Sequence, residues 1–448
     1  MAKAIMLGAV SSGCGKTTIT LGLIAALRAR GLKVQAFKVG PDYIDTSYHA
    51  IASGRPSHNL DNWLVPSVKL RELFESSIGD ADIAIVEGVM GLYDGGRLGI
   101  SSTAEIAKLL DVPIALVIDA KSIGASAAAI ALGFRAFDCD VEIAGVILNR
   151  LGSSTHQSMI EDALSSIGMK CFGGLRRDQT LAIPERHLGL LQSIENETSE
   201  LIDRLRAAVE TQLDLDALLD VAAPIYPKSG EIKKPRHSCK IGIARDEAFS
   251  FYYPASLAEL EQRGAELIEF SPLHDERLPQ VDGLILGGGY PEMFASQLES
   301  NATMREDIRR AAADGMPICA ECGGYMYLMR ELIDFDGRAH EMCGVISSRA
   351  AMNDRLQMVG YVAAELLGDC SIGRRGERVR AHEFHFSSVI EDDPTVERLF
   401  RCTRLRTGAK YDAGIVKGNV VGSYLHLHFA GCPSVAKRFI SVIQRLRP

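Results

Sequence analysis

The sequence predicts two α/β domains in tandem, and three observations lead to this prediction. Short apolar runs alternate with helical patterns through the first half of the 448-residue chain, as is typical of a parallel sheet covered on both faces. The stretch 221–240, "VAAPIYPKSGEIKKPRHSCK", interrupts this rhythm with three prolines and several basic residues. A second α/β series follows at once. We therefore expect domains at 1–223 and 239–448, joined by a linker at 224–238.

Each domain is expected to contain several buried strands. In the first domain the apolar runs are 3–10, 33–40, 81–90, 112–120 and 142–150, and residues 16–30 have a helical pattern. In the second domain the runs are 240–246, 266–272, 281–292, 316–324 and 420–429. Most of them end in glycine-rich or polar loops, where ligands of open α/β sheets bind.

The composition limits the class of protein and its partners. Hydrophobic residues make up 47% of the chain and charged residues 24%, which favours a sizeable core over disorder. A net charge of −8 argues against nucleic acid or an anionic membrane as the main partner. No run reaches the length of a membrane span, and Met1–Gly8 resembles a first strand more than a signal peptide. We expect a cytoplasmic protein whose ten scattered cysteines are reduced.

The stretch 8–20, "GAVSSGCGKTTIT", has the ending of a phosphate-binding loop, although Val10 stands where the usual pattern has its first glycine. The loop lies between an expected strand and an expected helix, which supports nucleotide binding over an ordinary glycine-rich turn. Backbone N–H groups would wrap the phosphates, a lysine would reach the β- and γ-phosphates, and a threonine hydroxyl would bind Mg²⁺. The predicted nucleotide-binding residues are Gly13, Cys14, Gly15, Lys16, Thr17 and Thr18.

Four acids follow the next expected strands of the first domain. Asp42 and Asp45 lie in "KVGPDYIDTSYH", and Glu87 and Asp94 lie in "VEGVMGLYDG". Any one of them could cap a helix or a turn. Because they stand near the carboxyl ends of neighbouring parallel strands, beside a phosphate loop, the group favours metal–ATP chemistry, with a Mg²⁺ ligand and substrate-orienting acids among them.

In the second domain, "PICAECGGYMYL" places Cys322 directly after an apolar run and before a helical segment. Ala320 and Gly324 are small, as a nucleophile on a sharp turn requires. A helix N-terminus is expected to lower the pKa of the thiol. Two alternatives remain, a redox pair with Cys319 and an inert buried thiol.

A nucleophilic cysteine needs a base and a site for the oxyanion. "GSYLHLHF" offers His426 and His428 on one face of a late strand, an arrangement that could also ligate a metal. Backbone N–H groups at Gly288 and Gly289 in "LGGGYPE", with that of Gly323, could form the oxyanion hole.

These motifs together resemble the cobyrinic acid a,c-diamide synthase family along essentially the whole chain. The resemblance is carried, in order, by "SSGCGKTT", "FKVGPDYID", "VEGVMGLYDG", "PERHLGL", "LGGGYPE", "AECGGYMYL", "HEFHFS" and "SYLHLHF". It implies an N-terminal dethiobiotin-synthetase-like P-loop domain, a group whose phosphate loops often lack the first glycine. It also implies a C-terminal class I glutamine amidotransferase domain.

The resemblance further implies a reaction. Cys322, with His426 as base, would release ammonia from L-glutamine, and ATP would phosphorylate acetate carboxylates of a tetrapyrrole polycarboxylate for amidation at positions c and a. Lys16 and Thr17 would bind ATP and Mg²⁺, and Glu87 would hold the metal or position the substrate. The residues implied around the substrate carboxylate and the intermediate are Asp42, Tyr43, Asp45 and Asp94.

The sequence departs from the family pattern at two positions and leaves alternatives open. His428 stands where class I amidotransferases carry the acid of a triad, and Ala381 replaces an expected glycine in "RAHEFHF", a motif that could touch substrate or hold only internal hydrogen bonds. The substrate could be a cobyrinate, sirohaem or nickel-sirohydrochlorin, held by a basic patch such as 373–380, "GRRGERVR". Cobyric acid synthase and a nucleotide-binding regulator with an inactive amidotransferase domain are further alternatives. A homodimer is expected because it is common among enzymes of this class.

Overall fold

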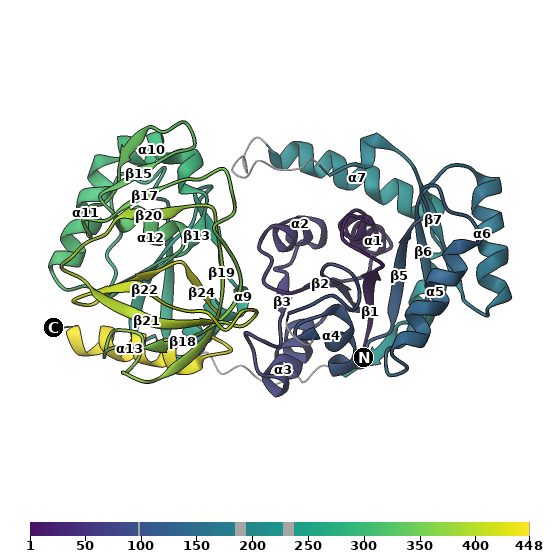
Figure 1. Cartoon of the computed structure of the whole chain (residues 1–448), viewed down its shortest axis with the longest axis horizontal. Coiled ribbons are helices and arrows are strands. Elements are labelled where there is room, and N and C mark those ends of the chain that lie inside the picture. Colours follow the sequence, from purple (N-terminus) through teal and green to yellow (C-terminus); the bar gives the residue numbers. More distant parts are fainter. Residues whose placement is uncertain (97–98, 184–193, 227–236, 448) are drawn as a thin grey trace. The chain divides into compact units, whose positions relative to one another are not determined.

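The computed structural model describes residues 1–96, 99–183, 194–226 and 237–447. The described residues form two compact units, the first built from 1–183 with 194–226 and the second from 237–447. The first unit is coloured purple to teal in Figure 1, and the second runs from green to yellow.

The first unit is built on a parallel sheet. Its strands are β1 (Ala2–Ala9), β2 (Val34–Val39), β3 (His58–Leu60), β4 (Ile83–Glu87), β5 (Ile114–Asp119), β6 (Ile143–Leu151), β7 (Cys171–Arg176) and β8 (Ala223–Ile225). The order is β3-β2-β4-β1-β5-β6-β7, all parallel, with β8 antiparallel to β1. Its helices are α1 (Lys16–Ala29), α2 (Ile44–Ser53), α3 (Ser67–Ile78), α4 (Thr103–Leu110), α5 (Ser126–Phe137), α6 (Ser154–Ser166), α7 (Ile194–Gln212), α8 (Leu215–Val221) and a 3₁₀ turn at Gln179–Leu181.

All five strands expected in this unit are present, because continuous apolar runs are what a sheet buried on both faces requires. α1, α2 and α7 lie together over one face of the sheet (Figure 1), and alternate residues of β1, β4 and β5 pack beneath them. The expected linker at 224–238 begins inside β8, so the first sheet extends two residues past 223. Residues 227–236 of that linker, and the whole of "PERHLGL" at 184–190, lie outside the described residues.

The second unit has a larger mixed sheet. Its strands are β9 (Cys239–Ala244), β10 (Phe249–Phe251), β11 (Ala265–Phe270), β12 (Gly283–Leu286), β13 (Gly288–Gly289), β14 (Ile318–Glu321), β15 (Glu331–Ile333), β16 (Ala339–Glu341), β17 (Arg349–Ala351), β18 (Met358–Leu366), β19 (Arg378–His385), β20 (Ser388–Glu391), β21 (Glu397–Arg404), β22 (Lys410–Lys417), β23 (Val420–Ser423) and β24 (Leu425–Leu427). Its helices are α9 (Pro254–Gln262), α10 (Ala295–Ser300), α11 (Ala302–Ala313), α12 (Gly323–Leu328) and α13 (Pro433–Leu446), with a 3₁₀ turn at Pro291–Phe294.

The main sheet runs β11-β9-β12-β14-β23-β22-β21-β18-β19-β24. The first five strands are parallel, as expected, and the others pair antiparallel. Sequence analysis missed β18, β19, β21 and β22, because their buried and exposed positions tend to alternate instead of forming continuous apolar runs. This antiparallel extension brings β24, which carries His426, beside β19.

No helix among the described residues is long and apolar enough to cross a membrane.

Candidate functional sites

The phosphate loop connects β1 to α1. Gly15 is the N-cap of α1 with φ 91°, and Gly13 has φ 77°, so both adopt a conformation that glycine tolerates best. A Cβ at Gly15 would lie 2.1 Å from Nδ2 of Asn149, which donates a 2.8 Å hydrogen bond to the Cys14 carbonyl. Asn149, at the end of β6, was not singled out from the sequence. It braces the loop in the shape that exposes a helix N-terminus to an anion.

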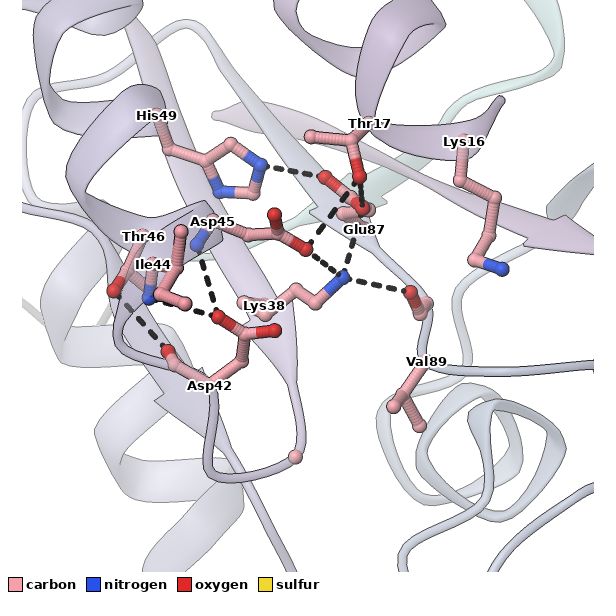
Figure 2. Close-up of polar contacts among 12 residues, drawn as sticks. Lys16, Thr17, Lys38, Asp42, Ile44, Asp45, Thr46, His49, Glu87 and Val89 are labelled. Carbon is pink, nitrogen blue, oxygen red and sulfur yellow. Dashed lines mark hydrogen bonds and ion pairs between the residues drawn. The ribbon is translucent and has the colours of Figure 1, made fainter. Parts of the chain in front are cut away.

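A cluster of charged side chains lies beside this loop (Figure 2). The Thr17 hydroxyl donates to Glu87 Oε1 at 2.6 Å, and Lys38 Nζ lies 2.8 Å from the same oxygen. The ammonium also lies 2.6 Å from Asp45 Oδ2. Lys38 and Glu87 are register partners on the neighbouring strands β2 and β4, and Asp45 is in the first turn of α2. The fold thus gathers a hydroxyl, two carboxylates and an ammonium from four elements.

Burial and mutual charge set the protonation of this cluster. Glu87 is fully buried, which would raise its pKa, but Lys38 and His49 together hold that pKa well below its usual range. Burial would lower the pKa of Lys38, yet Glu87 and Asp45 raise it. Burial, followed by the charge of Glu87, raises the pKa of Asp45 to about 6. At neutral pH the cluster therefore contains one ammonium held between two carboxylates.

The remaining predicted residues of this site take structural positions. Asp42 accepts hydrogen bonds from the N–H groups of Ile44 and Asp45 at 2.8 and 2.9 Å, which caps α2. The exposed Asp94 accepts the Gly91 N–H at 3.1 Å and closes a turn. Tyr43 is half-buried at the N-cap of α2. Asp45 and Glu87 are thus within hydrogen-bond reach of Thr17. The hydrogen bonds of Asp42 cap a helix, and that of Asp94 closes a turn.

Lys16 points away from this cluster toward the loop after β4. Its Nζ donates to the Met90 carbonyl at 2.5 Å, and burial together with the charge of Lys38 lowers its pKa. A cavity of about 240 Å³ opens on the other side of the loop, at the carboxyl ends of β5, β6 and β7. Gly15 and Thr18 line it together with Asn149. It is a concave space continuous with the phosphate loop, of the kind that ligands of α/β sheets occupy.

The oxygen atoms near Thr17 fit a magnesium ion in kind. A hydroxyl and carboxylates are the ligands that Mg²⁺ prefers, and Thr17 Oγ1 lies 2.6 Å from Glu87 and 3.5 Å from Asp45. No group of three or more His, Cys, Asp or Glu side chains in the described chain could hold a metal by itself. That is compatible with an ion that takes most of its ligands from phosphate and water.

In the second unit, Cys322 lies on a strained turn between β14 and α12. Its φ of 48° and ψ of −104° are unfavourable for a residue with a side chain, as expected of a nucleophile elbow. The Cys322 N–H donates to the Ser423 carbonyl, and a Cβ at Gly324 would lie 2.2 Å from the Leu286 carbonyl. Cys319 is buried inside β14, a position that argues against a redox pair with Cys322.

The expected lowering of the Cys322 pKa is wrong for this structure. Burial raises the pKa of the thiol, and the charge of Glu292 adds to the increase, whereas the Gly323 N–H lowers it only in part. The side chain is 6% exposed, and α12 has only six residues. Desolvation of the thiolate outweighs the field of so short a helix. Deprotonation of Cys322 therefore depends on a neighbouring base.

His426 and His428 occupy different surroundings. His426 is buried in β24, and burial, together with His382 and His385, lowers its pKa to about 3. Its Nδ1 lies 4.0 Å from Oε2 of Glu321, the residue before Cys322. His428, one residue past β24, is stacked on Tyr253 with ring centroids 4.7 Å apart. His428 therefore packs against an aromatic ring at the position where the sequence comparison with class I amidotransferases led us to expect an acid.

The glycines predicted for the oxyanion hole adjoin the nucleophile. A Cβ at Gly323 would lie 3.1 Å from the backbone nitrogen of Gly289. Gly288 and Gly289 form β13, which pairs with β10, and a Cβ at Gly288 would lie 2.7 Å from Cε1 of His426. The fold thus brings these glycines next to the elbow and the histidine. Their role in binding an oxyanion stays a prediction.

The "HEFHFS" motif forms the end of β19 and passes beside Cys322, whose Sγ lies 3.8 Å from the Phe384 carbonyl oxygen. His385 is stacked on Tyr424 and is hydrogen-bonded to Glu383 Oε1 and to the Ser387 carbonyl. The other oxygen of Glu383 accepts the Tyr411 hydroxyl. Of the two roles considered for this motif, these hydrogen bonds favour for His385 the one within the domain over contact with the substrate.

Both units of the chain match known protein families. Residues 5–191 match the family described as the CobQ/CobB/MinD/ParA nucleotide binding domain, and residues 240–433 match the CobB/CobQ-like glutamine amidotransferase domain. The cobyrinate a,c-diamide synthase of Syntrophotalea carbinolica is 42% identical over 97% of each chain. The chain belongs to the cobyrinate a,c-diamide synthase family. Other synthases of that name, from Methanothermobacter thermautotrophicus and Listeria monocytogenes, are 42% and 44% identical, over 97% and 95% of this chain and 98% and 96% of theirs.

Membership in the cobyrinate a,c-diamide synthase family settles the class of reaction. The chain is a glutamine-dependent ligase that uses ATP, with a nucleotide-binding half and an amidotransferase half. The expected fold class is confirmed. Sequence reasoning missed Lys38, His49, Asn149 and Glu321. Lys38 could have been found because a lysine inside an apolar strand is unusual, and Glu321 because it is an acid directly before the nucleophile. No sequence signal pointed to His49.

Proposed function

We propose that this protein amidates the a and c acetate carboxylates of a cobyrinate-type tetrapyrrole in cobalamin biosynthesis, using ATP and two molecules of glutamine. The relatives named above are cobyrinate a,c-diamide synthases, and they match this chain along nearly its whole length. The proposed ligands are a tetrapyrrole polycarboxylate, L-glutamine and Mg–ATP. Sirohaem and nickel-sirohydrochlorin offer acetates for the same chemistry and are tested as alternative acceptors below.

In the proposed first half-reaction, a carboxylate oxygen of the substrate attacks the γ-phosphorus of ATP, and ADP leaves. Gly13, Cys14 and Gly15 hold the phosphates through N–H groups, and Lys16 neutralises charge on the β- and γ-phosphates. The cavity beside Thr18 and Asn149 accommodates the rest of the nucleotide. Thr17 and Glu87 hold Mg²⁺, which when bound offsets the charge of the phosphates.

In the proposed second half-reaction, ammonia attacks the carbonyl carbon of the acyl phosphate, and phosphate leaves. The attacking nitrogen must lose a proton, which a nearby carboxylate accepts. Asp45 suits this step because its raised pKa of about 6 leaves it ionised at neutral pH while keeping it more basic than an ordinary aspartate. Asp42, Tyr43 and Asp94 are the other residues proposed around the substrate carboxylate.

Ammonia is proposed to come from glutamine at Cys322. The sulfur attacks the amide carbon while His426 accepts the thiol proton, and the oxyanion is held by N–H groups of Gly288, Gly289 and Gly323. His426 returns the proton to the leaving nitrogen, and water then hydrolyses the thioester to glutamate. The low pKa of His426 keeps the imidazole unprotonated at neutral pH, as a base must be, but it also makes that imidazole a weak base.

One observation supports this proposal most directly, the contact of the phosphate-loop Thr17 with Glu87, whose carboxylate shares Lys38 with Asp45. A phosphate loop that only bound a nucleotide would not need a second, partly buried acid and a lysine held beside it. A carboxyl-activating ligase needs charged groups at that place to bind the acceptor and accept a proton.

The experiment incubates the protein with Mg–ATP, glutamine and each tetrapyrrole in turn, and follows ADP and product mass. The proposal predicts two successive one-unit mass decreases on a cobyrinate. Glutamine hydrolysis with no amidated cobyrinate would contradict the proposed acceptor.

Variants separate the two halves. Cys322→Ala should abolish glutamine use and keep ammonia-dependent amidation, and Lys16→Ala should stop both routes. Cys319→Ala is the matched control and should keep both. Loss of the ammonia-dependent route in Cys322→Ala would contradict this division of labour. A homodimer stays a prediction, which light scattering of the purified protein tests.

A further inference from the structure

Three acids lie close enough to Cys322 to act on its thiol, and the proposed chemistry uses none of them. Glu292, Glu321 and Glu383 each raise the pKa of the thiol by their charge. A carboxylate beside a nucleophilic cysteine that it does not serve is a cost, since its negative charge opposes formation of the thiolate. At least one of them is therefore expected to act on another member of the site.

The contacts distinguish these acids. Both oxygens of Glu383 are occupied, one by His385 and one by Tyr411. Glu321 has the geometry of a partner for the base, because its Oε2 lies 4.0 Å from His426 Nδ1 and its Oε1 accepts the Leu427 N–H at 3.2 Å. The side chains are 12% and 3% exposed, so solvent screens this interaction weakly.

We propose that Glu321 is the positioning residue of His426, supplying from the residue before the nucleophile the carboxylate that this chain lacks two residues after the histidine. This inference rests on the proposed role of Cys322 and His426 in glutamine hydrolysis. Backbone hydrogen bonds fix the arrangement, since the Cys322 N–H donates to Ser423 and the Leu427 N–H donates to Glu321. The nucleophile, its acidic neighbour and the strand of the base are thereby held in one register.

Glu321 can position His426 because it lies on the Nδ1 side of the imidazole ring. A carboxylate at Nδ1 favours the tautomer with the proton on Nδ1, which leaves Nε2 free of a proton and able to accept one from a thiol. The same carboxylate stabilises the imidazolium that forms when the proton arrives. This stabilisation matters at His426, because His382 and His385 from β19 and burial all disfavour its charged form. Glu321 is the acid placed to offset them. Burial raises its own pKa to about 8, so the carboxylate form that does so gains population as the pH rises toward that value.

The test compares Glu321→Gln, which removes the charge and keeps the shape, with Glu321→Asp, which keeps the charge. Glutamate release and ammonia-dependent amidation are measured separately across pH on the full chain. For Glu321→Gln we expect glutamine kcat to fall at least tenfold with ammonia-dependent kcat unchanged. The limb of the glutamine kcat/KM profile that reports His426 should move to lower pH, because a lost carboxylate disfavours the imidazolium. Glu321→Asp should retain the position of that limb.

Asp334→Asn provides a matched control. Asp334 and His340 form another carboxylate–imidazole pair of the same unit, 2.9 Å apart, with no role in the proposed chemistry, so this change should leave the profile unchanged. An unchanged glutamine profile in Glu321→Gln would overturn the inference. A lower kcat with the limb in its original place would also overturn it, because a merely structural role predicts that result. Glutamine hydrolysis by Cys322→Ala would instead overturn the proposed function.

Discussion

Replacing Lys38 by methionine should destabilise the first unit far more than the loss of an ordinary ion pair. The Lys38 side chain is 4% exposed, and its two partners Glu87 and Asp45 are 0% and 20% exposed. Methionine fills nearly the same space, so the main effect is that two buried carboxylates lose their cation. Removing one partner of a buried pair costs about 3–5 kcal/mol. We expect the low end, about 3 kcal/mol, because Thr17 and His49 still bind Glu87 and Asp45 is partly hydrated.

The cost should depend on pH in a direction that the structure determines. In the wild type the pKa of Glu87 is below its ordinary value of 4.5, so its contribution is present above that pH and is lost as the pH falls. Without Lys38, burial is opposed at Glu87 mainly by His49, so the pKa of Glu87 rises, and that of Asp45 rises further. Protonation then relieves the buried charge. The difference in unfolding free energy between wild type and variant should therefore be largest at neutral pH and should shrink toward pH 5.

The assay is urea unfolding followed by the fluorescence of Trp63, the single tryptophan of the chain, which is 9% exposed and lies in the first unit. Its signal reports that unit alone. Lys33→Met is the control, because Lys33 makes a 2.7 Å ion pair with Asp80 in which both side chains are more than half exposed. That change should leave the transition nearly in place. A Lys38→Met loss below about 1 kcal/mol, or a loss that does not diminish at low pH, would refute the reasoning.

Two further predictions concern the same unit. Gly15→Ala should weaken ATP binding at least tenfold, because a Cβ there meets Asn149 at 2.1 Å and the residue has φ 91°; calorimetry measures it, and wild-type affinity would contradict the geometry. Asp94→Asn keeps an acceptor for the Gly91 N–H, so the turn and the thermal midpoint should survive. If Asp94 serves the reaction, ammonia-dependent kcat should nevertheless fall at least tenfold, whereas full activity would assign Asp94 to the turn alone.

Much of the fold follows from local patterns. The strands of both parallel regions are continuous apolar runs, and each recognisable loop lies next to such a strand. The phosphate loop and the elbow could also be located from local patterns. Gly15 and Cys322 have positive φ, and turns of this kind are marked by small residues within a few positions of the sequence. The antiparallel strands at 358–417 escaped because alternation over mixed polar residues is a weak signal.

The sequence by itself determined the family and the reaction class, because these depend on short motifs whose chemistry is local. It also named most of the residues proposed to react, whose roles stay predictions. Only the tertiary structure decided the electrostatics. Lys38 meets Glu87, 49 positions away along the chain, because β2 lies beside β4. Glu321 approaches His426, 105 positions away, because β14 lies beside β23, which leads into β24. Burial raised the pKa of Cys322 against the local expectation. Strand order and desolvation depend on contacts between residues far apart in the chain, so a short stretch of sequence cannot reveal them.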